Sequence, residues 1–124
     1  METIRILIAD DHLFYREGVR TLLKGVPEVA IVGDATSGDE AVAQAAQLQP
    51  NIVLMDIKMP GITGVEAARR INESAPQTVV FLCSTYDLAD LPAQVGVDGV
   101  AAYVHKEELR PELLAQLWRD HAPT

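Results

Sequence analysis

One stretch near the middle of the chain limits the possible folds more than any other. The apolar run from Ile52 to Met55 ends on a carboxylate, Asp56, and Pro60 and Gly61 impose a turn soon afterwards. Such continuous apolar runs are typical of strands buried on both faces of a parallel sheet. In open parallel α/β sheets, ligands bind beyond the carboxyl ends of the strands. Asp56 is therefore a candidate for chemistry, although an isolated Asp at this place more often caps a turn or a helix.

A second run of the same kind begins the chain and ends on two more carboxylates. The apolar residues 4–9 lead directly into Asp10 and Asp11. If this strand lies parallel to and beside the first, three carboxylates meet at one sheet edge, where close like charges repel one another. A cation would relieve this repulsion, and hard carboxylate oxygens suit Mg²⁺. A carboxylate can also accept a phosphoryl group. The pattern predicts a magnesium-assisted phosphoryl acceptor.

Strand-like runs alternate with helical patterns along the whole chain. This alternation predicts an α/β fold with one parallel sheet and helices on both faces. The first helix is expected to bury Leu13, Val19, Leu22 and Leu23, whereas Pro92 and Gly96 predict a short or irregular fourth helix. Strands are expected at 4–9, 29–33, 51–56, 78–83 and 101–104, and helices at 13–24, 37–49, 63–74, 87–98 and 108–121.

Length and charge limit the domain count and the kinds of partner. A chain of 124 residues makes one domain over 1–124 with a substantial core. Its net charge of −8 argues against binding nucleic acid without a further domain. Cys83 is the only cysteine and is expected to be a buried hydrophobe. We see neither a signal peptide nor a membrane span, and expect a cytoplasmic protein.

Polar residues follow four of the five predicted strands. Right-handed crossovers keep the carboxyl ends of all the strands at one edge, so these side chains should converge there. We expect Asp56 to be the nucleophile and Lys106 to neutralise charge on phosphoryl oxygens. Asp11, with Asp10, would hold Mg²⁺. The backbone carbonyl of Lys58 could be a further ligand of Mg²⁺, and Ser84 could donate a hydrogen bond to the phosphoryl group.

These motifs together resemble a known family over essentially the whole chain. The pair Asp10-Asp11, the loop 56–61, Ser84-Thr85 and Lys106 are similar in order and spacing to the receiver domain of bacterial two-component response regulators. The segment 9–20 further resembles the NarL/FixJ subfamily. The resemblance implies a flavodoxin-like five-stranded sheet of order 2-1-3-4-5, with the first and third strands side by side.

The resemblance also implies a signalling mechanism. A sensor histidine kinase would transfer a phosphoryl group to Asp56 with Mg²⁺ bound, and Ser84 and Tyr103 would then switch the output surface. Lys58 and Tyr86 occupy positions that tune dephosphorylation in the family. The family further implies a homodimer on phosphorylation and DNA contact only through a separate helix-turn-helix domain after residue 124, with no membrane partner.

Several alternatives stay open at this point. Tyr103 is otherwise a partly exposed strand residue, and Ser84 a strand-end cap. The irregular stretch 92–102 falls on the family's usual output surface, so an interaction module or phosphate shuttle competes with a transcription regulator. A phosphatase would need an acid two residues after the nucleophile, where Lys58 stands, so we expect no turnover enzyme. His12 and His105 flank the pocket, and we expect them to be hydrogen-bonded bystanders rather than ligands.

Overall fold

Five parallel strands form one sheet of order β2-β1-β3-β4-β5, which confirms the predicted topology. The computed structural model describes residues 3–85 and 99–123. The predicted helix at 87–98, with Pro92 and Gly96, and the predicted tuning residue Tyr86 lie outside the described residues. The strands are β1 (Ile4–Ala9), β2 (Val29–Ala35), β3 (Ile52–Asp56), β4 (Val79–Ser84) and β5 (Val100–His105).

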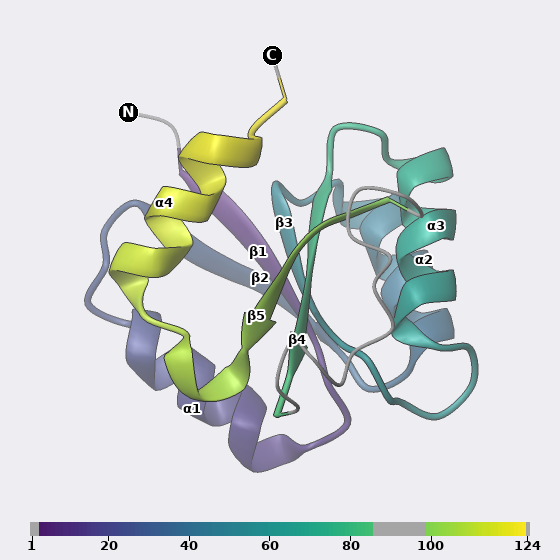
Figure 1. Cartoon of the computed structure of the whole chain (residues 1–124), viewed down its shortest axis with the longest axis horizontal. Helices are drawn as coiled ribbons and strands as arrows, with labels where there is room; N and C mark the ends of the chain where they lie inside the picture. Colours follow the sequence, from purple (N-terminus) through teal and green to yellow (C-terminus); the bar gives the residue numbers. More distant parts are fainter. Residues whose placement is uncertain (1–2, 86–98, 124) are drawn as a thin grey trace.

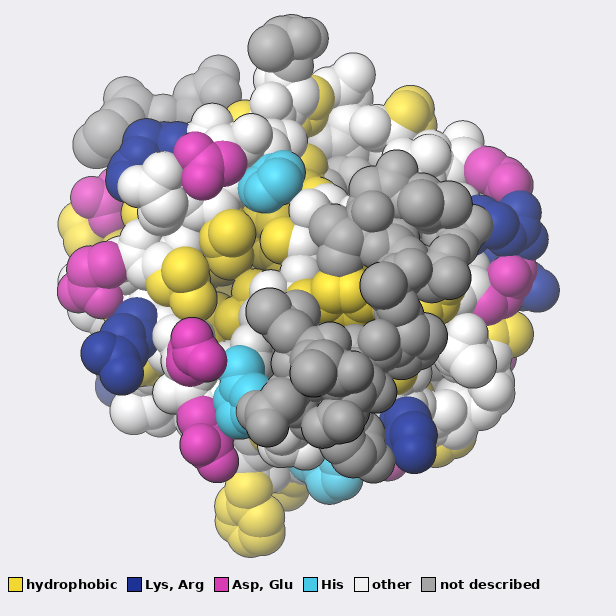
Figure 2. Space-filling view, in the orientation of Figure 1, with side chains coloured by type: hydrophobic (Ala, Val, Ile, Leu, Met, Phe, Trp, Pro, Cys, Tyr) yellow, Lys and Arg dark blue, Asp and Glu magenta, His cyan; other side chains and the backbone are white. Residues whose placement is uncertain are grey.

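Helices cover both faces of the sheet (Figure 1). One face carries α1 (Leu13–Leu23) and the C-terminal helix α4 (Pro111–His121), and the other carries α2 (Gly38–Leu48) and α3 (Gly64–Ser74). In the part of the chain that the structure describes, no helix is both long enough and apolar enough to cross a membrane. In the view of Figure 2, acidic and basic side chains are interspersed around the visible face.

The central strands explain why the sequence shows uninterrupted apolar runs. Every residue of β3 and β4 is buried. Successive side chains of a strand point to opposite faces, so Val53 and Met55 join the core under α2 and α3, whereas Ile52 and Leu54 join the core under α1 and α4. A strand with a core on each side needs apolar residues at every position.

The final helix begins later than predicted. We expected it from Glu108, but the structure has a short 3₁₀ turn at Lys106–Glu108 and begins α4 at Pro111. Arg110 is extended, with φ −146° and ψ 156°. The cause is Pro111, because a proline disfavours the helical conformation of the residue before it while fitting well at the first helical position.

The prediction that all four leucine and valine positions of α1 are buried was partly wrong. Val19 and Leu23 are buried, but Leu13 is 53% exposed and Leu22 is 39% exposed. The stripe that packs on the sheet consists of Tyr15, Val19 and Leu23, which follow one another at intervals of four residues. Leu13 and Leu22 lie away from this stripe, because residues four apart share a helix face.

The start of α3 holds the loop after β3 close to Asp56. The backbone N–H of Gly64 donates to the carbonyl oxygen of Ile57 at 2.9 Å. A Cβ atom at Gly64 would collide with the carbonyl oxygen of Asp56 and lie 3.0 Å from the Cα atom of Ile57. The helix can therefore approach the acceptor strand this closely only with glycine at this position.

This close approach predicts opposite effects for two glycine-to-alanine changes. We expect Gly64→Ala to destabilise the fold by about 1–3 kcal/mol, as overpacking does. Gly18→Ala, in an exposed helical position with nothing within 4 Å of the new Cβ, should stabilise it by about 0.5–1 kcal/mol. Urea unfolding of both variants measures the difference, and equal effects would contradict the proposed contact.

Candidate functional site

The register of the strands brings their polar ends to one edge of the sheet. Ala9 pairs with Met55, so the residues that follow them, Asp10 and Asp56, emerge side by side. Asp56 in turn pairs with Cys83, and the next residue, Ser84, pairs with His105. Lys106 follows His105 directly. The structure therefore brings Asp10, Asp56, Ser84 and Lys106 together, as the parallel topology predicts.

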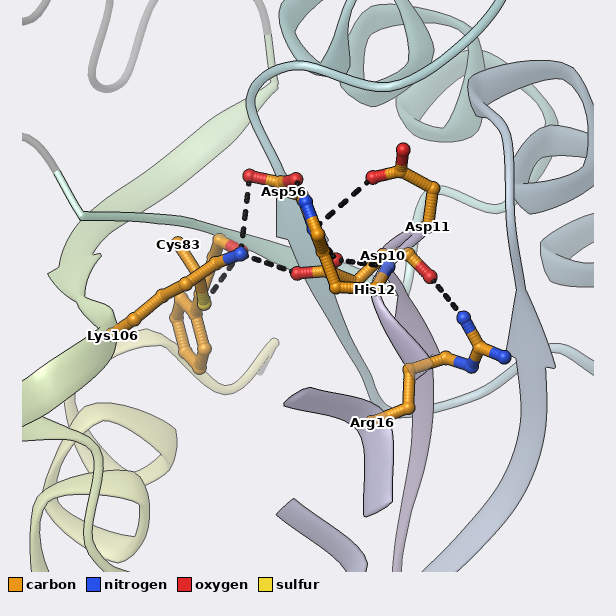
Figure 3. A network of polar contacts seen from close by, with 8 residues as sticks. Asp10, Asp11, His12, Arg16, Asp56, Cys83 and Lys106 are labelled. Atoms are coloured by element: carbon orange, nitrogen blue, oxygen red, sulfur yellow. Dashed lines mark hydrogen bonds and ion pairs between the residues drawn. The ribbon is translucent and has the colours of Figure 1, made fainter. Parts of the chain in front are cut away.

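A buried ion pair forms the base of the site. Asp10 is only 1% exposed, and its Oδ2 atom lies 2.5 Å from the ammonium nitrogen of Lys106. The same ammonium is 3.5 Å from Oδ1 of Asp56. Arg16 also donates to the backbone carbonyl of Asp10, at 2.7 Å. Lys106 thus bridges carboxylates from two neighbouring strands (Figure 3). The pairing matters for the stability of the fold, because a buried charge without a partner is strongly destabilising.

Burial and charge both act on the predicted nucleophile. Asp56 is 7% exposed. Its burial raises the pKa of the carboxyl group, and the negative charge of Asp10 raises it further, against the opposing charge of Lys106. The ionised form of Asp56 is therefore under-compensated in this pocket, and any further positive charge would stabilise it.

His12 lies inside the acid cluster rather than beside it. Its Nδ1 atom is 2.8 Å from Asp10, 3.3 Å from Asp11 and 4.0 Å from Asp56. The hydrogen bond to Asp10, together with the charges of Asp10 and Asp11, raises the pKa of the His12 imidazole. Figure 3 shows the imidazole between the three carboxylates, with Lys106 approaching from the side opposite Asp11.

A pocket of about 380 Å³ opens over these groups. Ser84 is buried in its wall, whereas Lys58 and Thr85 are exposed at its rim. The lining residues are His12, Tyr15, Asp56, Ile57, Lys58, Ser84, Thr85 and Lys106. The pocket is large enough for a small charged group to reach the Asp56 carboxylate.

The donor set fits a divalent cation. One carboxylate oxygen from each of Asp10, Asp11 and Asp56 lies with the His12 nitrogen in a cluster whose ligand atoms are all within 4.8 Å of one another. Three hard oxygen donors at this spacing suit Mg²⁺. The carbonyl of Lys58 as a further ligand stays a prediction.

Tyr103 is placed away from this cluster. It lies on β5, half-buried, and packs against the core under α2 and α3. The described residues that line the pocket do not include it. Its predicted switch role would require a rearrangement and stays a prediction.

Tyr15 is a site residue that sequence reasoning missed. The Lys106 ammonium lies 4.3 Å from the centroid of the Tyr15 ring, within the range of a cation–π contact. Burial raises the pKa of the Tyr15 phenol above its ordinary value. Tyr15 lies in the first turn of α1, on the helix face that packs on the sheet, and nothing in the sequence indicated that this ring would meet Lys106.

Cys83 follows Leu82 on β4 and is a free, buried cysteine. Burial raises the pKa of its thiol to about 12. The predicted role of a small buried hydrophobe is confirmed by its place in the core under α1 and α4.

Comparison with known proteins identifies the family. Residues 6–118 match the family model described as the response regulator receiver domain. Response regulator GacA of Pseudomonas viridiflava is 38% identical over 103 residues, which make up 83% of this chain and 48% of GacA. The chain thus spans about half the length of the curated relatives it matches.

Solved structures give the same result. The signal receiver domain of NarL from Mycobacterium tuberculosis superposes with a TM-score of 0.83 at 31% identity, covering 97% of each chain. A DNA-binding response regulator of the LuxR family from Staphylococcus aureus has a TM-score of 0.79 at 28% identity, covering 94% of this chain and 97% of that one. These neighbours share the whole fold described above.

The ring of Tyr15 should be coupled energetically to Lys106. In a double-mutant cycle of Tyr15→Leu with Lys106→Met, we expect a coupling energy of about 0.5–2 kcal/mol in urea unfolding, the range of a partly desolvated cation–π contact. The matched cycle with Tyr15→Phe keeps the ring and should give almost no coupling. Equal coupling in both cycles would mean that the hydroxyl, and not the ring, holds the lysine.

Proposed function

Because the chain belongs to the response regulator receiver family and is of the NarL/FixJ type, we propose that it is a phosphoryl-accepting switch. Receiver domains act in two-component signalling, in which response regulators interact with histidine kinases. The proposed acceptor is Asp56, and the observation that supports it most is the position of its carboxylate. It lies at the floor of an open pocket, 3.5 Å from the Lys106 ammonium.

The proposed reaction moves a phosphoryl group from nitrogen to oxygen. An oxygen of Asp56 attacks the phosphorus of a phosphohistidine on the kinase, so that an O–P bond forms while the P–N bond breaks. The kinase imidazole leaves with the electron pair and keeps or takes up one proton. Lys106 neutralises charge on the transferred oxygens, and Ser84 donates a hydrogen bond to them. The chain contributes positioning and charge, and we propose no turnover of a separate substrate.

Receiver domains bind Mg²⁺ at an acidic pocket, and the cluster described above fits that ion. We propose that Asp10, Asp11 and Asp56 hold it, with the backbone carbonyl of Lys58. When bound, the ion supplies positive charge against the phosphoryl oxygens and the crowded carboxylates. Lys106 contacts Asp10 and Asp56 as well, so its positive charge would add to that of the ion.

Phosphorylation would shift the population between two surface states. We propose that Ser84 moves toward the phosphoryl group and Tyr103 turns inward from its half-buried position on β5. Lys58, at the pocket rim, and Tyr86 would tune the rate of dephosphorylation. The shifted surface would favour a homodimer.

The output of the switch is proposed from the relatives. The chain covers about half of GacA, and one structural neighbour is titled a DNA-binding response regulator of the LuxR family. We therefore propose that residues 1–124 are the receiver part of a transcription regulator that reaches DNA through a separate helix-turn-helix domain. We further propose that this protein acts in the cytoplasm, where its partner would be a sensor histidine kinase.

Covalent labelling tests the acceptor directly. Incubation with phosphoramidate and Mg²⁺ should add one phosphoryl group to the wild type, detected by intact mass spectrometry and removed by hydroxylamine. Asp56→Asn should add none, because an amide is not a nucleophile here. Asp120→Asn, on the exposed face of α4, is the matched control and should label like the wild type. Labelling that persists in Asp56→Asn would refute the assignment.

Amide NMR tests the switch. Beryllofluoride with Mg²⁺ should shift the resonances around Asp56, Ser84, Lys106 and Tyr103 in the wild type and leave Asp56→Asn unchanged. Shifts confined to the pocket residues, with Tyr103 unmoved, would keep the acceptor and reject the proposed switch.

A further inference from the structure

The acid cluster contains a nitrogen atom that an all-oxygen magnesium site does not need. The described residues with ligand atoms in the cluster are Asp10, Asp11, Asp56 and His12. Imidazole is a poor partner for Mg²⁺, but it suits Zn²⁺, Co²⁺ and similar ions. The position of His12 therefore bears on which metals the pocket accepts.

The backbone holds His12 in place. It is the residue before α1, with an extended backbone of φ −96° and ψ 109°. Its N–H donates to Oδ1 of Asp10 at 2.8 Å. This local turn directs the side chain back over the acid pair, although 66% of that side chain is exposed and could have pointed to water.

The distances match those between ligands of one ion. In an octahedral site with bonds of about 2.1 Å, adjacent ligand atoms are about 3.0 Å apart and opposite ones about 4.2 Å apart. From Nδ1 of His12, the oxygens of Asp10 and Asp11 are at 2.8 and 3.3 Å, and the oxygen of Asp56 is at 4.0 Å. The imidazole thus stands adjacent to two carboxylates and nearly opposite the third. Its contact with Asp10 is a hydrogen bond, so a metal bound at Nδ1 would displace the proton there.

Lys106 does not compete for the same oxygens. It contacts Oδ2 of Asp10 and Oδ1 of Asp56, whereas His12 faces Oδ1 of Asp10 and Oδ2 of Asp56. Each buried carboxylate therefore presents one oxygen to the lysine and the other to the side where the imidazole lies. A metal on the His12 side would leave the lysine contacts intact.

We propose that Nδ1 of His12 is a metal ligand, so that the pocket binds transition-metal ions such as Zn²⁺ and Co²⁺ through a mixed nitrogen–oxygen donor set. Mg²⁺ would use the same carboxylates without the imidazole. The inference deepens the proposed function, since it concerns the metal site of the same pocket. It predicts a selectivity for metals that depends on one side chain.

Metal titrations of the whole chain, followed by calorimetry, test this selectivity. His12→Ala should weaken Zn²⁺ binding at least about tenfold, because even residues that only orient a metal ligand change affinity about 10- to 100-fold. The same change should not weaken Mg²⁺ binding, because Mg²⁺ takes oxygen ligands and the imidazole contacts the same carboxylates. His105→Ala is the matched control, since His105 is a histidine of the same sheet edge that is not among the cluster residues. It should change neither affinity.

Long-range ¹H–¹⁵N spectra of the histidines give a second measurement on the wild type. The chain has three histidines. Zn²⁺ should move the Nδ1 resonance of His12 to the position of a metal-bound nitrogen, whereas Mg²⁺ should change only the protonation of the ring, by neutralising the carboxylates beside it. If Mg²⁺ binds but Zn²⁺ leaves His12 Nδ1 unmoved, or if His12→Ala weakens both metals equally, the inference is wrong and the magnesium site stands. If neither metal binds, the metal site of the proposed function fails as well.

Discussion

The buried contact between Asp10 and Lys106 is the interaction on which the rest of the site depends. Asp10 is almost fully buried at the end of β1, and the lysine that compensates its charge comes from the far end of the chain, after β5. These strands are not neighbours in the sheet, since β3 and β4 lie between them. The ion pair therefore spans the two intervening strand ends, which carry Asp56 and Ser84, and the ammonium group contacts Asp56 as well.

The negative charges of the site are only partly compensated by its positive ones. Three carboxylates share one edge, and Lys106 and the His12 imidazole contact them, yet burial and Asp10 still raise the pKa of Asp56. This imbalance costs stability, as buried charges do when their compensation is incomplete. It also leaves the pocket ready to gain from an added cation or from a phosphoryl group bound together with one. The same charges that strain the fold provide the driving force for binding.

Much of this arrangement could be predicted from the sequence, because strand period and chain topology fix where strand ends go. The order of the sheet and the convergence of Asp10, Asp56, Ser84 and Lys106 follow from buried apolar runs and right-handed crossovers. The start of α4 was misplaced because Arg110 precedes a proline. Tyr15 was missed because a contact between a helix residue and a lysine 91 positions later depends on helix rotation, which apolar spacing defines only coarsely.

The two residues whose environment the sequence did not reveal, His12 and Tyr15, belong to the same turn at the start of α1. The turn is short in sequence, but its side chains contact residues far along the chain. His12 contacts carboxylates that follow β1 and end β3, and Tyr15 contacts the lysine after β5. The acidic residues of the site can be recognised in the sequence by their spacing. The neighbouring residues that change the charge balance of these acids can be identified only in the folded structure, because their contacts form when the sheet assembles. Differences in metal preference and in lysine placement between chains with the same acids should therefore arise from this first turn of α1.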